Sequence, residues 1–232
     1  PWCITLQLEG AASSARTDCL RLLDEGRALG IYAYFLHCGA SAGALELALE
    51  LARKAPECGF PVFLSPELVE PWVDQLSTCP NVLVLLDTGS PDWQAAAALL
   101  RDARRFFGYF IRCDSEECAQ TVLSGEWVRS LLGHGGSMAF CLPEEHCPAE
   151  LSARLYNYVA QARNTHQYPL LLMDYCRDVL LVDEVISDSP RYLEFLPDGQ
   201  AVTYADGRKQ PLPDVLSGLS LSEFLRSRFR RT

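Results

Sequence analysis

The sequence contains no apolar run that approaches the roughly 18–20 residues a helix needs to cross a bilayer, so a membrane-spanning protein is not expected. Its first residues, PWCITLQLEG, have no basic flank and too short an apolar stretch for a signal peptide. Positive charge is scarce as well, because 20 Lys and Arg face 30 Asp and Glu, for a formal net charge of −10. Nucleic acids and anionic membranes are bound through Lys and Arg, so neither is an expected partner.

The phosphate-binding motifs of nucleotide-dependent enzymes are missing too. No GxGxxG follows the first predicted strand, and no GxxxxGK[ST] occurs anywhere in the chain. Doubly wound nucleotide-binding folds therefore have no motif support. What the chain does have is the composition of a globular protein, with 49% hydrophobic and 22% charged residues over 232 positions.

Cysteine is abundant, with ten residues. A chain of this length can bury a core without cross-links, so a secreted disulfide scaffold is not needed. Most of the cysteines stand beside apolar residues or near the ends of predicted strands. Reduced thiols used as small core residues are the simpler interpretation, and they favour a cytoplasmic protein.

Six short apolar runs at regular spacing predict β-strands, and the segments between them have the 3.6-residue period of amphipathic helices. The runs are ITLQL (4–8), YAYFLH (32–37), PVFLS (61–65), VLVLLD (82–87), YFIRC (109–113) and MAFCL (138–142). LLLMDY (170–175) is a candidate for a further strand. Strands that alternate with helices pair in parallel through right-handed crossovers. The sequence thus predicts an α/β fold, as either a doubly wound sheet or an open, partial (β/α) barrel.

The pattern changes after residue 176. RYLEF (191–195) and AVTYA (201–205), joined by the turn PDGQ, predict a β-hairpin. A segment rich in Pro and Leu then leads to a closing helix, SLSEFLRSRF, with a serine as its cap. We therefore expect a barrel-like unit at 1–176 and a small hairpin-plus-helix extension at 177–232.

Five stretches, taken in order, carry a family resemblance. They are DCLRLLDEGRALGIYAYFLHCGAS, LLDTGSPDWQAAAALLRDA, FGYFIRCDSEECAQTVLSGEWVRSLLGHGG, SPRYLEFLPDGQAVTY and LSGLSLSEFLRSRF. The first three resemble radical SAM proteins, in the approach to the GGEP motif, the turn after strand four and the fifth barrel unit. The last two resemble a SPASM-type C-terminal extension. The resemblance covers nearly the whole chain and implies a partial (β/α)6 TIM-like barrel followed by that extension.

The same resemblance implies a [4Fe–4S] cluster and S-adenosylmethionine, but their contacts are missing. Radical SAM proteins hold the cluster through a CxxxCxxC triplet just after strand one, where this chain reads LEGAASSART (8–17) without a cysteine. The counterpart of GGEP is CGAS (38–41), which lacks the acidic residue, and Tyr204 stands where the extension would carry a ligating cysteine. A triplet upstream of residue 1 would need a strand before the six already counted. No cofactor is therefore expected.

In a (β/α) barrel, the carboxyl ends of the strands and the loops that follow them form the functional face. That face is the expected ligand-binding site with or without a cofactor. The residues placed there are Glu9, Cys38, Ser65, Asp87, Arg112, Asp114, Glu144 and Asp174. Asp87 has the best support, because it lies in the turn that resembles the family's strand-four turn. Its carboxylate would bind a ligand hydroxyl or ammonium, or else form an Asx turn within DTGSPD.

One group of residues has the right atoms for a metal. Cys141, His146 and Cys147 offer two thiolates and an imidazole, which are ligands that suit zinc. The three are crowded into seven residues, with no CxxC knuckle and no evident fourth ligand. Ordinary loop residues after the sixth strand are the alternative interpretation.

Two further pairings that involve cysteine are weaker still. Cys113 and Cys118 can approach across one helical turn, for which a structural role is the simpler explanation. His37 and Cys38, together at the end of the second strand, suggest a base and a nucleophile. Adjacent residues of a strand point to opposite faces of the sheet, however, so the sequence argues against that dyad.

A retained framework without its cofactor contacts favours one function. We expect a non-catalytic, radical SAM-like protein that acts as a binding or partner subunit, for a peptide or a maturation enzyme. The net negative charge favours a basic partner. The alternatives are an enzyme that uses the barrel mouth with another cofactor, and an atypical radical SAM enzyme with different cluster cysteines.

Overall fold

The computed structural model describes residues 1–11, 15–143, 147–186, 192–205, 208–215 and 220–228. The strands are β1 (Cys3–Gln7), β2 (Ala33–Gly39), β3 (Phe60–Leu64), β4 (Val82–Asp87), β5 (Phe107–Cys113), β6 (Met138–Pro143), β7 (Leu171–Asp174), β8 (Glu194–Phe195), β9 (Gln200–Ala205) and β10 (Arg208–Val215). The helices are α1 (Ala15–Ala28), α2 (Ala42–Lys54), the 3₁₀ helix η1 (Pro66–Leu68), α3 (Val69–Ser77), α4 (Trp93–Asp102), α5 (Glu116–Leu123), α6 (Glu126–Leu131), α7 (Ala149–Asn164), α8 (Tyr175–Ile186) and α9 (Leu221–Arg228). None of the helices in these ranges is long and apolar enough to cross a membrane.

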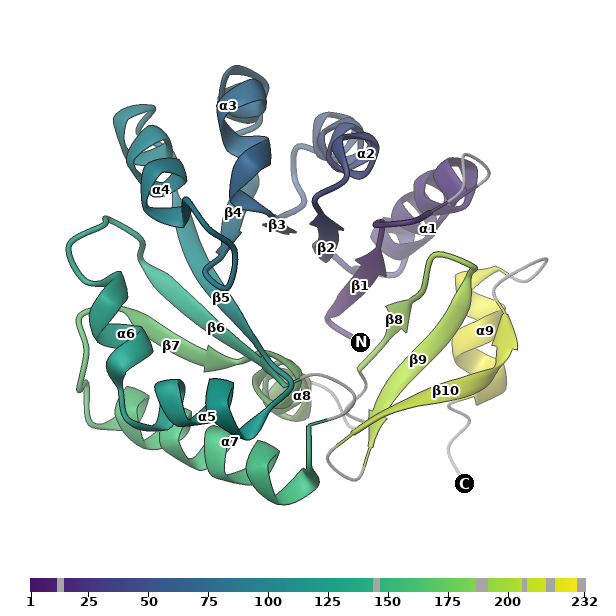
Figure 1. The fold of residues 1–232 in the computed structure, drawn as a ribbon. Coiled ribbons are helices and arrows are strands. Elements are labelled where there is room, and N and C mark those ends of the chain that lie inside the picture. Colours follow the sequence, from purple (N-terminus) through teal and green to yellow (C-terminus); the bar gives the residue numbers. More distant parts are fainter. Residues whose placement is uncertain (12–14, 144–146, 187–191, 206–207, 216–219, 229–232) are drawn as a thin grey trace.

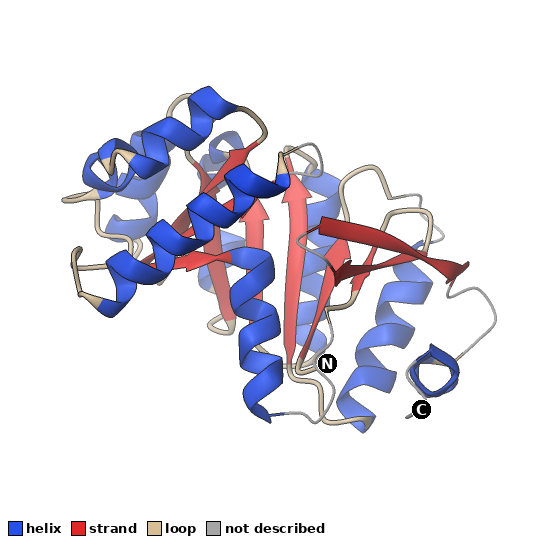
Figure 2. Ribbon diagram, turned by 90° about the horizontal axis from the view of Figure 1, so that it is seen from below, coloured by secondary structure: helices blue, strands red, loops and turns tan. Residues whose placement is uncertain are grey.

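The strands form one curved sheet in the order β10-β9-β8-β1-β2-β3-β4-β5-β6-β7. From β1 to β7, each strand is parallel to the next along the chain. A doubly wound sheet would reverse this order at a switch point, so the observed order is that of the open, partial TIM-like barrel. Figure 1 shows the sheet as an arc with α1 to α4 on its outer side, and Figure 2 shows the strands side by side with helices around them. The candidate strand at 170–175 is confirmed as β7.

Alternation along the strands divides the buried side chains into two layers. On the outer side, residues such as Ile4, Leu36 and Val84 pack under the surrounding helices. On the inner side, Phe35 and Phe63 belong to a second cluster that fills the concave face. Burial of both faces explains why the strands read as nearly continuous apolar runs.

Helix α8 lies in the opening of the arc and covers the inner layer (Figure 1). Its first residue, Tyr175, stacks edge-on against Phe35 and Phe63 at ring-centroid distances of 5.2 and 5.3 Å. The Tyr175 hydroxyl and Thr5 Oγ1 share a 2.6 Å hydrogen bond. Further along the helix, Asp183 Oδ1 accepts a 2.8 Å hydrogen bond from the backbone N–H of Trp2. The helix is thus bound at two levels to β1 and the residue before it.

The C-terminal extension contains the predicted hairpin and continues the same sheet. β8 pairs in parallel with β1 and antiparallel with β9, which in turn pairs with β10. Helix α9 lies near α1 and begins with a capping box, since Glu223 N–H donates to Ser220 Oγ and Ser220 N–H donates to Glu223 Oε2. The expected division between 176 and 177 falls inside α8.

Gly108 in β5 leaves no room for a side chain. A Cβ at this position would lie 2.6 Å from the carbonyl oxygen of Met138 in the neighbouring strand β6. We expect Gly108→Ala to lower the free energy of unfolding by about 1–3 kcal/mol in urea denaturation, because the two strands must separate locally. Gly43→Ala is the matched control, since no atom lies within 4 Å of its Cβ position in α2 and the change should be neutral or stabilising by about 0.5–1 kcal/mol. Equal stability of the two variants would contradict the packing described.

Candidate functional site

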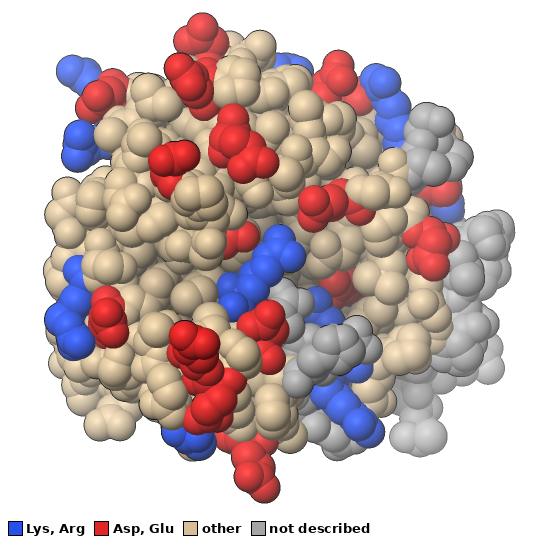
Figure 3. Space-filling model, in the orientation of Figure 1, with Lys and Arg blue, Asp and Glu red and all other residues tan. Residues whose placement is uncertain are grey.

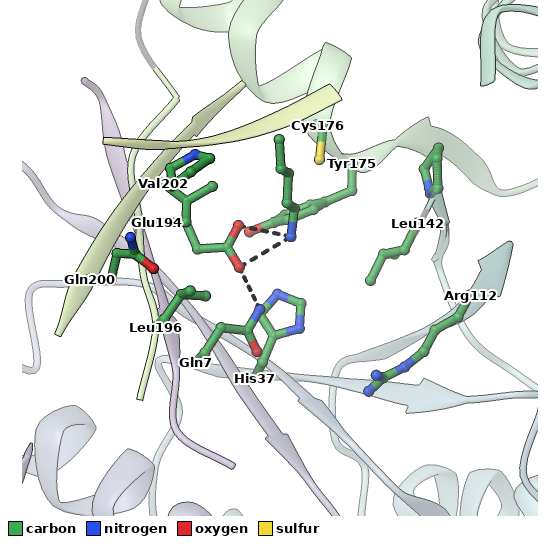
Figure 4. A pocket seen from close by; sticks show the side chains of 13 residues that line it. Gln7, His37, Arg112, Leu142, Tyr175, Cys176, Glu194, Leu196, Gln200 and Val202 are labelled. Atoms are coloured by element: carbon green, nitrogen blue, oxygen red, sulfur yellow. Dashed lines mark hydrogen bonds and ion pairs between the residues drawn. The ribbon is translucent and has the colours of Figure 1, made fainter. Parts of the chain in front are cut away.

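A pocket of about 490 Å³ opens at the mouth of the half barrel, where the ends of β1, β2, β5 and β6 face the extension (Figure 4). Its polar lining residues are Gln7, His37, Arg112, Glu194, Gln200 and Lys209. Its apolar lining residues are Leu142, Pro143, Tyr175, Cys176, Leu196, Val202 and Pro211. The volume is within the range of pockets that take small molecules or single side chains of a peptide. Both parts of the chain build it, since the barrel strands supply one wall and β8 to β10 the other.

Glu194 is the centre of the polar wall. Its side chain is 1% exposed and accepts hydrogen bonds from Gln7 Nε2 at 2.7 Å and from the Tyr192 hydroxyl at 2.8 Å. Lys209 Nζ lies 2.8 Å from Glu194 Oε2 and 3.1 Å from Oε1. A buried carboxylate needs this many partners to offset its loss of hydration. The network fixes the position of Lys209 at the edge of the pocket.

His37 lies at the floor of the pocket. Its ring stacks on Phe63 at a centroid distance of 4.2 Å and an interplanar angle of 10°, and meets Tyr175 edge-on. Burial holds the pKa of His37 well below its usual range, and the positive charges of Lys209 and Arg112 act in the same direction. The imidazole is therefore neutral at pH 7. Its Nε2 is buried without a hydrogen-bond partner among the described residues, so it is a polar group ready to bond to a ligand.

Arg112 lies on the opposite wall of the pocket, and Asp87 lies beside it without lining the pocket. Arg112 Nε lies 3.7 Å from Asp87 Oδ2, and the guanidinium stands 5.6 Å from the centroid of the Phe110 ring. Asp87 Oδ1 accepts a 2.9 Å hydrogen bond from the Gly89 N–H, which is the Asx turn expected for DTGSPD. Burial raises the pKa of Asp87, against the lowering effects of that hydrogen bond and of Arg112. At 3.7 Å the ion pair is longer than a charge-assisted hydrogen bond of about 2.7–2.9 Å.

The space-filling view into the mouth shows how charge is distributed around it (Figure 3). Basic side chains lie in the hollow at the centre of this face, and acidic side chains lie around it. Of the acidic residues predicted at the strand ends, Glu9 and Asp114 are exposed and Asp87 is half-buried. The entrance is therefore acidic and the interior carries Arg112 and Lys209.

Among the predicted mouth residues that the structure describes, Arg112 alone lines the pocket. Glu9 accepts a long hydrogen bond of 3.4 Å from the Ala40 N–H on the rim. Cys38 packs in the outer layer, between sheet and helices, while its neighbour His37 faces inward. This confirms that the two cannot form a dyad. Ser65 makes no side-chain cap to η1, and Glu144 lies outside the described residues.

Asp174 caps α8 and does not line the pocket. Its Oδ1 accepts a 3.1 Å hydrogen bond from the Arg177 N–H, and its backbone N–H donates to Asp178 Oδ2. Asp178 is itself held by Arg163, whose two terminal nitrogens lie 2.6 and 2.9 Å from its carboxylate. Asp174 Oδ2 is buried without a hydrogen-bond partner among the described residues. Burial raises the pKa of Asp174 to about 7.

The predicted zinc ligands are partly outside the described residues. His146 lies in the segment 144–146, which the structure does not describe. Cys141 is buried in β6, and Cys147 is half-buried before α7. Over the described ranges, no group of three or more His, Cys, Asp or Glu side chains is arranged to hold a metal ion.

Four polar pocket residues were not expected from the sequence at this place: Gln7, Glu194, Gln200 and Lys209. Gln7 and Glu194 each interrupt an apolar strand, in ITLQL and RYLEF, and this is a signal that sequence reading could have used. Their meeting depends on the pairing of β1 with β8, in which Leu6 lies opposite Phe195. No local pattern in the sequence predicts that register.

Comparison with known proteins bears on the fold. No family model matches the sequence, and no curated protein matches it. Among solved structures, the chain is similar to a histidine-tagged "anSMEcpe with bound AdoMet", an anaerobic sulfatase-maturating enzyme, with a TM-score of 0.54 and 12% identity. The match covers 96% of this chain and 79% of the other. The fold is therefore radical SAM-like. At this identity the likeness concerns the fold alone.

The ion pair between Lys209 and Glu194 can be tested by a double-mutant cycle. Lys209→Met leaves a buried carboxylate short of its cation, so we expect a loss of about 2–3 kcal/mol in the free energy of unfolding. In the double variant Glu194→Gln/Lys209→Met much of that loss should be recovered, giving a coupling above about 1 kcal/mol. The exposed pair Arg154 and Glu116, 3.2 Å apart, should couple by less than about 0.5 kcal/mol. Additive effects at the buried pair would contradict the network.

The raised pKa of Asp174 predicts that the free energy of unfolding depends on pH. Its pKa of about 7 in the folded chain is above the unfolded value of about 3.9, so the unfolded chain loses the proton first as pH rises. The free energy of unfolding should then fall between about pH 4 and pH 7 and level off above that.

Asp174→Asn keeps an oxygen for the helix cap and removes the titration. Relative to this variant, the wild type should lose on the order of 2–4 kcal/mol between pH 4 and pH 8 in urea denaturation. Asp102→Asn is the control on a 74% exposed side chain, and its difference from wild type should stay constant. A constant difference for Asp174→Asn would show that folding does not raise the pKa of this carboxyl group.

Proposed function

We propose that this chain is a binding or partner subunit on a radical SAM-like scaffold, without cluster chemistry, and that it acts in the cytoplasm. Its site is the pocket at the barrel mouth. The observation that supports the proposal is that a polar, preformed pocket occurs together with a loop after β1 that contains no cysteine. Peptide segments of a partner protein, such as a maturation enzyme, are the class of ligand that fits best.

The donor set argues against a resident [4Fe–4S] cluster. Residues 8–17, which follow β1, contain no cysteine. The nearest thiols on either side along the chain, Cys3 and Cys19, are buried in β1 and α1. Burial raises the pKa of Cys3 above its ordinary range, and it raises the pKa of Cys19 to about 11. Three convergent thiolates are needed for the cluster, and these residues do not supply them.

The interior of the barrel also favours packing over a deep cofactor cavity. Phe63 contacts Phe110, Phe140 and Tyr175 at centroid distances of 5.1, 6.0 and 5.3 Å. These rings and α8 fill the concave face up to the level of His37. The pocket lies above them, between the sheet and the extension.

The charges of the pocket indicate the chemistry of its ligand. The Arg112 side chain is 41% exposed and lines the pocket. A carboxylate of a ligand that enters the pocket can take a bidentate place on this guanidinium. The acidic residues around the entrance favour basic residues beside it. We infer a peptide that inserts a carboxylate, from Asp, Glu or the C-terminus, with basic residues on either side.

This proposal predicts the outcome of a selection from a random peptide library displayed on phage. Enriched peptides should carry a carboxylate within a basic sequence. Peptides with an amidated C-terminus, or with Asn or Gln in place of Asp or Glu, then identify the carboxylate that enters the pocket by their loss of binding. In fluorescence anisotropy, Arg112→Gln should weaken binding about tenfold or more, while Arg101→Gln on α4 should leave it unchanged. Enrichment without carboxylates, or no loss in Arg112→Gln, would contradict the ligand class.

A second measurement addresses the absence of cluster chemistry. After anaerobic incubation with iron and sulfide, the purified chain should remain colourless. Broad absorbance at about 400 nm with stoichiometric iron would instead support the atypical radical SAM alternative. If such a brown protein also bound the peptide, the binding role of the pocket would stand and only the non-catalytic assignment would be overturned.

A further inference from the structure

Three thiols meet on the outer side of the sheet, away from the pocket. Cys113 ends β5, Cys141 lies in β6, and Cys118 lies in the first turn of α5. Cys113 Sγ is 3.5 Å from Cys141 Sγ and 3.6 Å from Cys118 Sγ. These are contact distances between sulfur atoms. The sequence suggested the approach of Cys113 and Cys118 but gave no indication of the third thiol.

The three thiols differ in access to solvent. Cys113 and Cys141 are 0% exposed, while Cys118 is partly exposed. The Cys118 thiol donates to the carbonyl oxygen of Arg112 at 3.0 Å. An oxidant in solution therefore reaches Cys118 first, with Cys113 immediately behind it.

Backbone geometry distinguishes the two pairs that Cys113 could form. In the β5–β6 register, Cys141 lies opposite Ile111, so Cys113 and Cys141 are diagonal neighbours on rigid strands. With parallel strands about 4.8 Å apart and a two-residue offset of about 6.6 Å, their Cα atoms are about 8 Å apart, beyond the Cα separation that a disulfide spans. Cys118 follows the strand after the short Asp114–Ser115 connection. Its sulfur needs to move about 1.5 Å to reach the bonding distance of about 2.05 Å.

We propose that Cys113 and Cys118 are a modification site, at which a peroxide converts the two thiols into a reversible disulfide. Cys118, as thiolate, attacks the peroxide, the O–O bond breaks, and the sulfur becomes a sulfenic acid while water is released. Cys113 then attacks the Cys118 sulfur, the S–O bond breaks, and the hydroxyl leaves with a proton as a second water. The two thiols are oxidised by two electrons, and one peroxide is reduced to two waters.

Two structural features set the rate and the consequence of this step. The hydrogen bond to Cys113 and burial raise the pKa of the Cys118 thiol above its usual range. Thiolate is therefore scarce, and the rate of oxidation should rise with pH, about tenfold per unit. The disulfide also removes the S–H donor to the Arg112 carbonyl. The Arg112 side chain lines the pocket. The oxidation therefore removes a hydrogen bond from the backbone of a pocket residue.

The test is treatment of the folded chain with hydrogen peroxide, followed by alkylation in denaturant and peptide mapping. We expect two of the ten thiols to be lost, a linked peptide that joins Cys113 to Cys118, and full reversal by dithiothreitol. Cys118→Ala should abolish the linkage. Cys147→Ser, a change at the other partly exposed thiol, should leave it intact.

Several results would overturn the proposal. They are a linkage of Cys113 to Cys141, a linkage of Cys118 to Cys147, survival of all ten thiols, and protection of the cluster by a metal found in the purified chain.

Because Cys118 is only half-buried, Cys118→Ala is expected to keep the far-ultraviolet circular dichroism of the wild type. Cys118→Ser provides a second variant if alanine perturbs α5. Peptide binding at the pocket is measured separately, so failure here is distinct from failure of the proposed function.

Discussion

A curved parallel sheet that does not close must bury its concave face, and here that burial is centred on Tyr175. Its ring contacts aromatic side chains of β2, β3 and β6 and, on the extension side, Tyr192 at a centroid distance of 6.2 Å. Its hydroxyl is bonded to Thr5 in β1. A buried aromatic hydroxyl needs such a partner. One residue thus links strands from both halves of the arc, and the floor of the pocket is formed by the same ring.

The pocket follows from this arrangement. Tyr175 and the phenylalanine rings fill the lower part of the barrel, and the pocket lies above them at the strand ends, beside His37 and the Glu194–Lys209 pair. A scaffold that is radical SAM-like in fold therefore presents a polar pocket above an aromatic core. The fold defines where a ligand would bind, and the residues at that place define which chemistry it would meet.

Much of the fold could be predicted from the sequence, because periodicity is a local property. The six apolar runs gave β1 to β6 to within two residues, and the Asx turn at Asp87 was available from DTGSPD. β10 was missed, because it includes prolines and extends into the Pro- and Leu-rich segment for which no strand was expected. The site was much less predictable. Cys38 and Asp174 end strands as expected, yet Cys38 faces the outer helices and Asp174 caps α8. Which face a strand-end residue occupies, and which strands meet across the mouth, depends on registers between segments far apart in the chain.

The pairing of β1 with β8 has a consequence for how the molecule assembles. Gln7 and Glu194 are separated by 187 positions in the chain, so the pocket contains contacts of very high sequence separation, which form late because the closure of such a loop is entropically costly. During synthesis the edge of β1 stays open until the extension emerges from the ribosome. An open edge of a parallel sheet can pair with other chains. The pocket and protection from aggregation therefore arise together, at the moment when the extension docks.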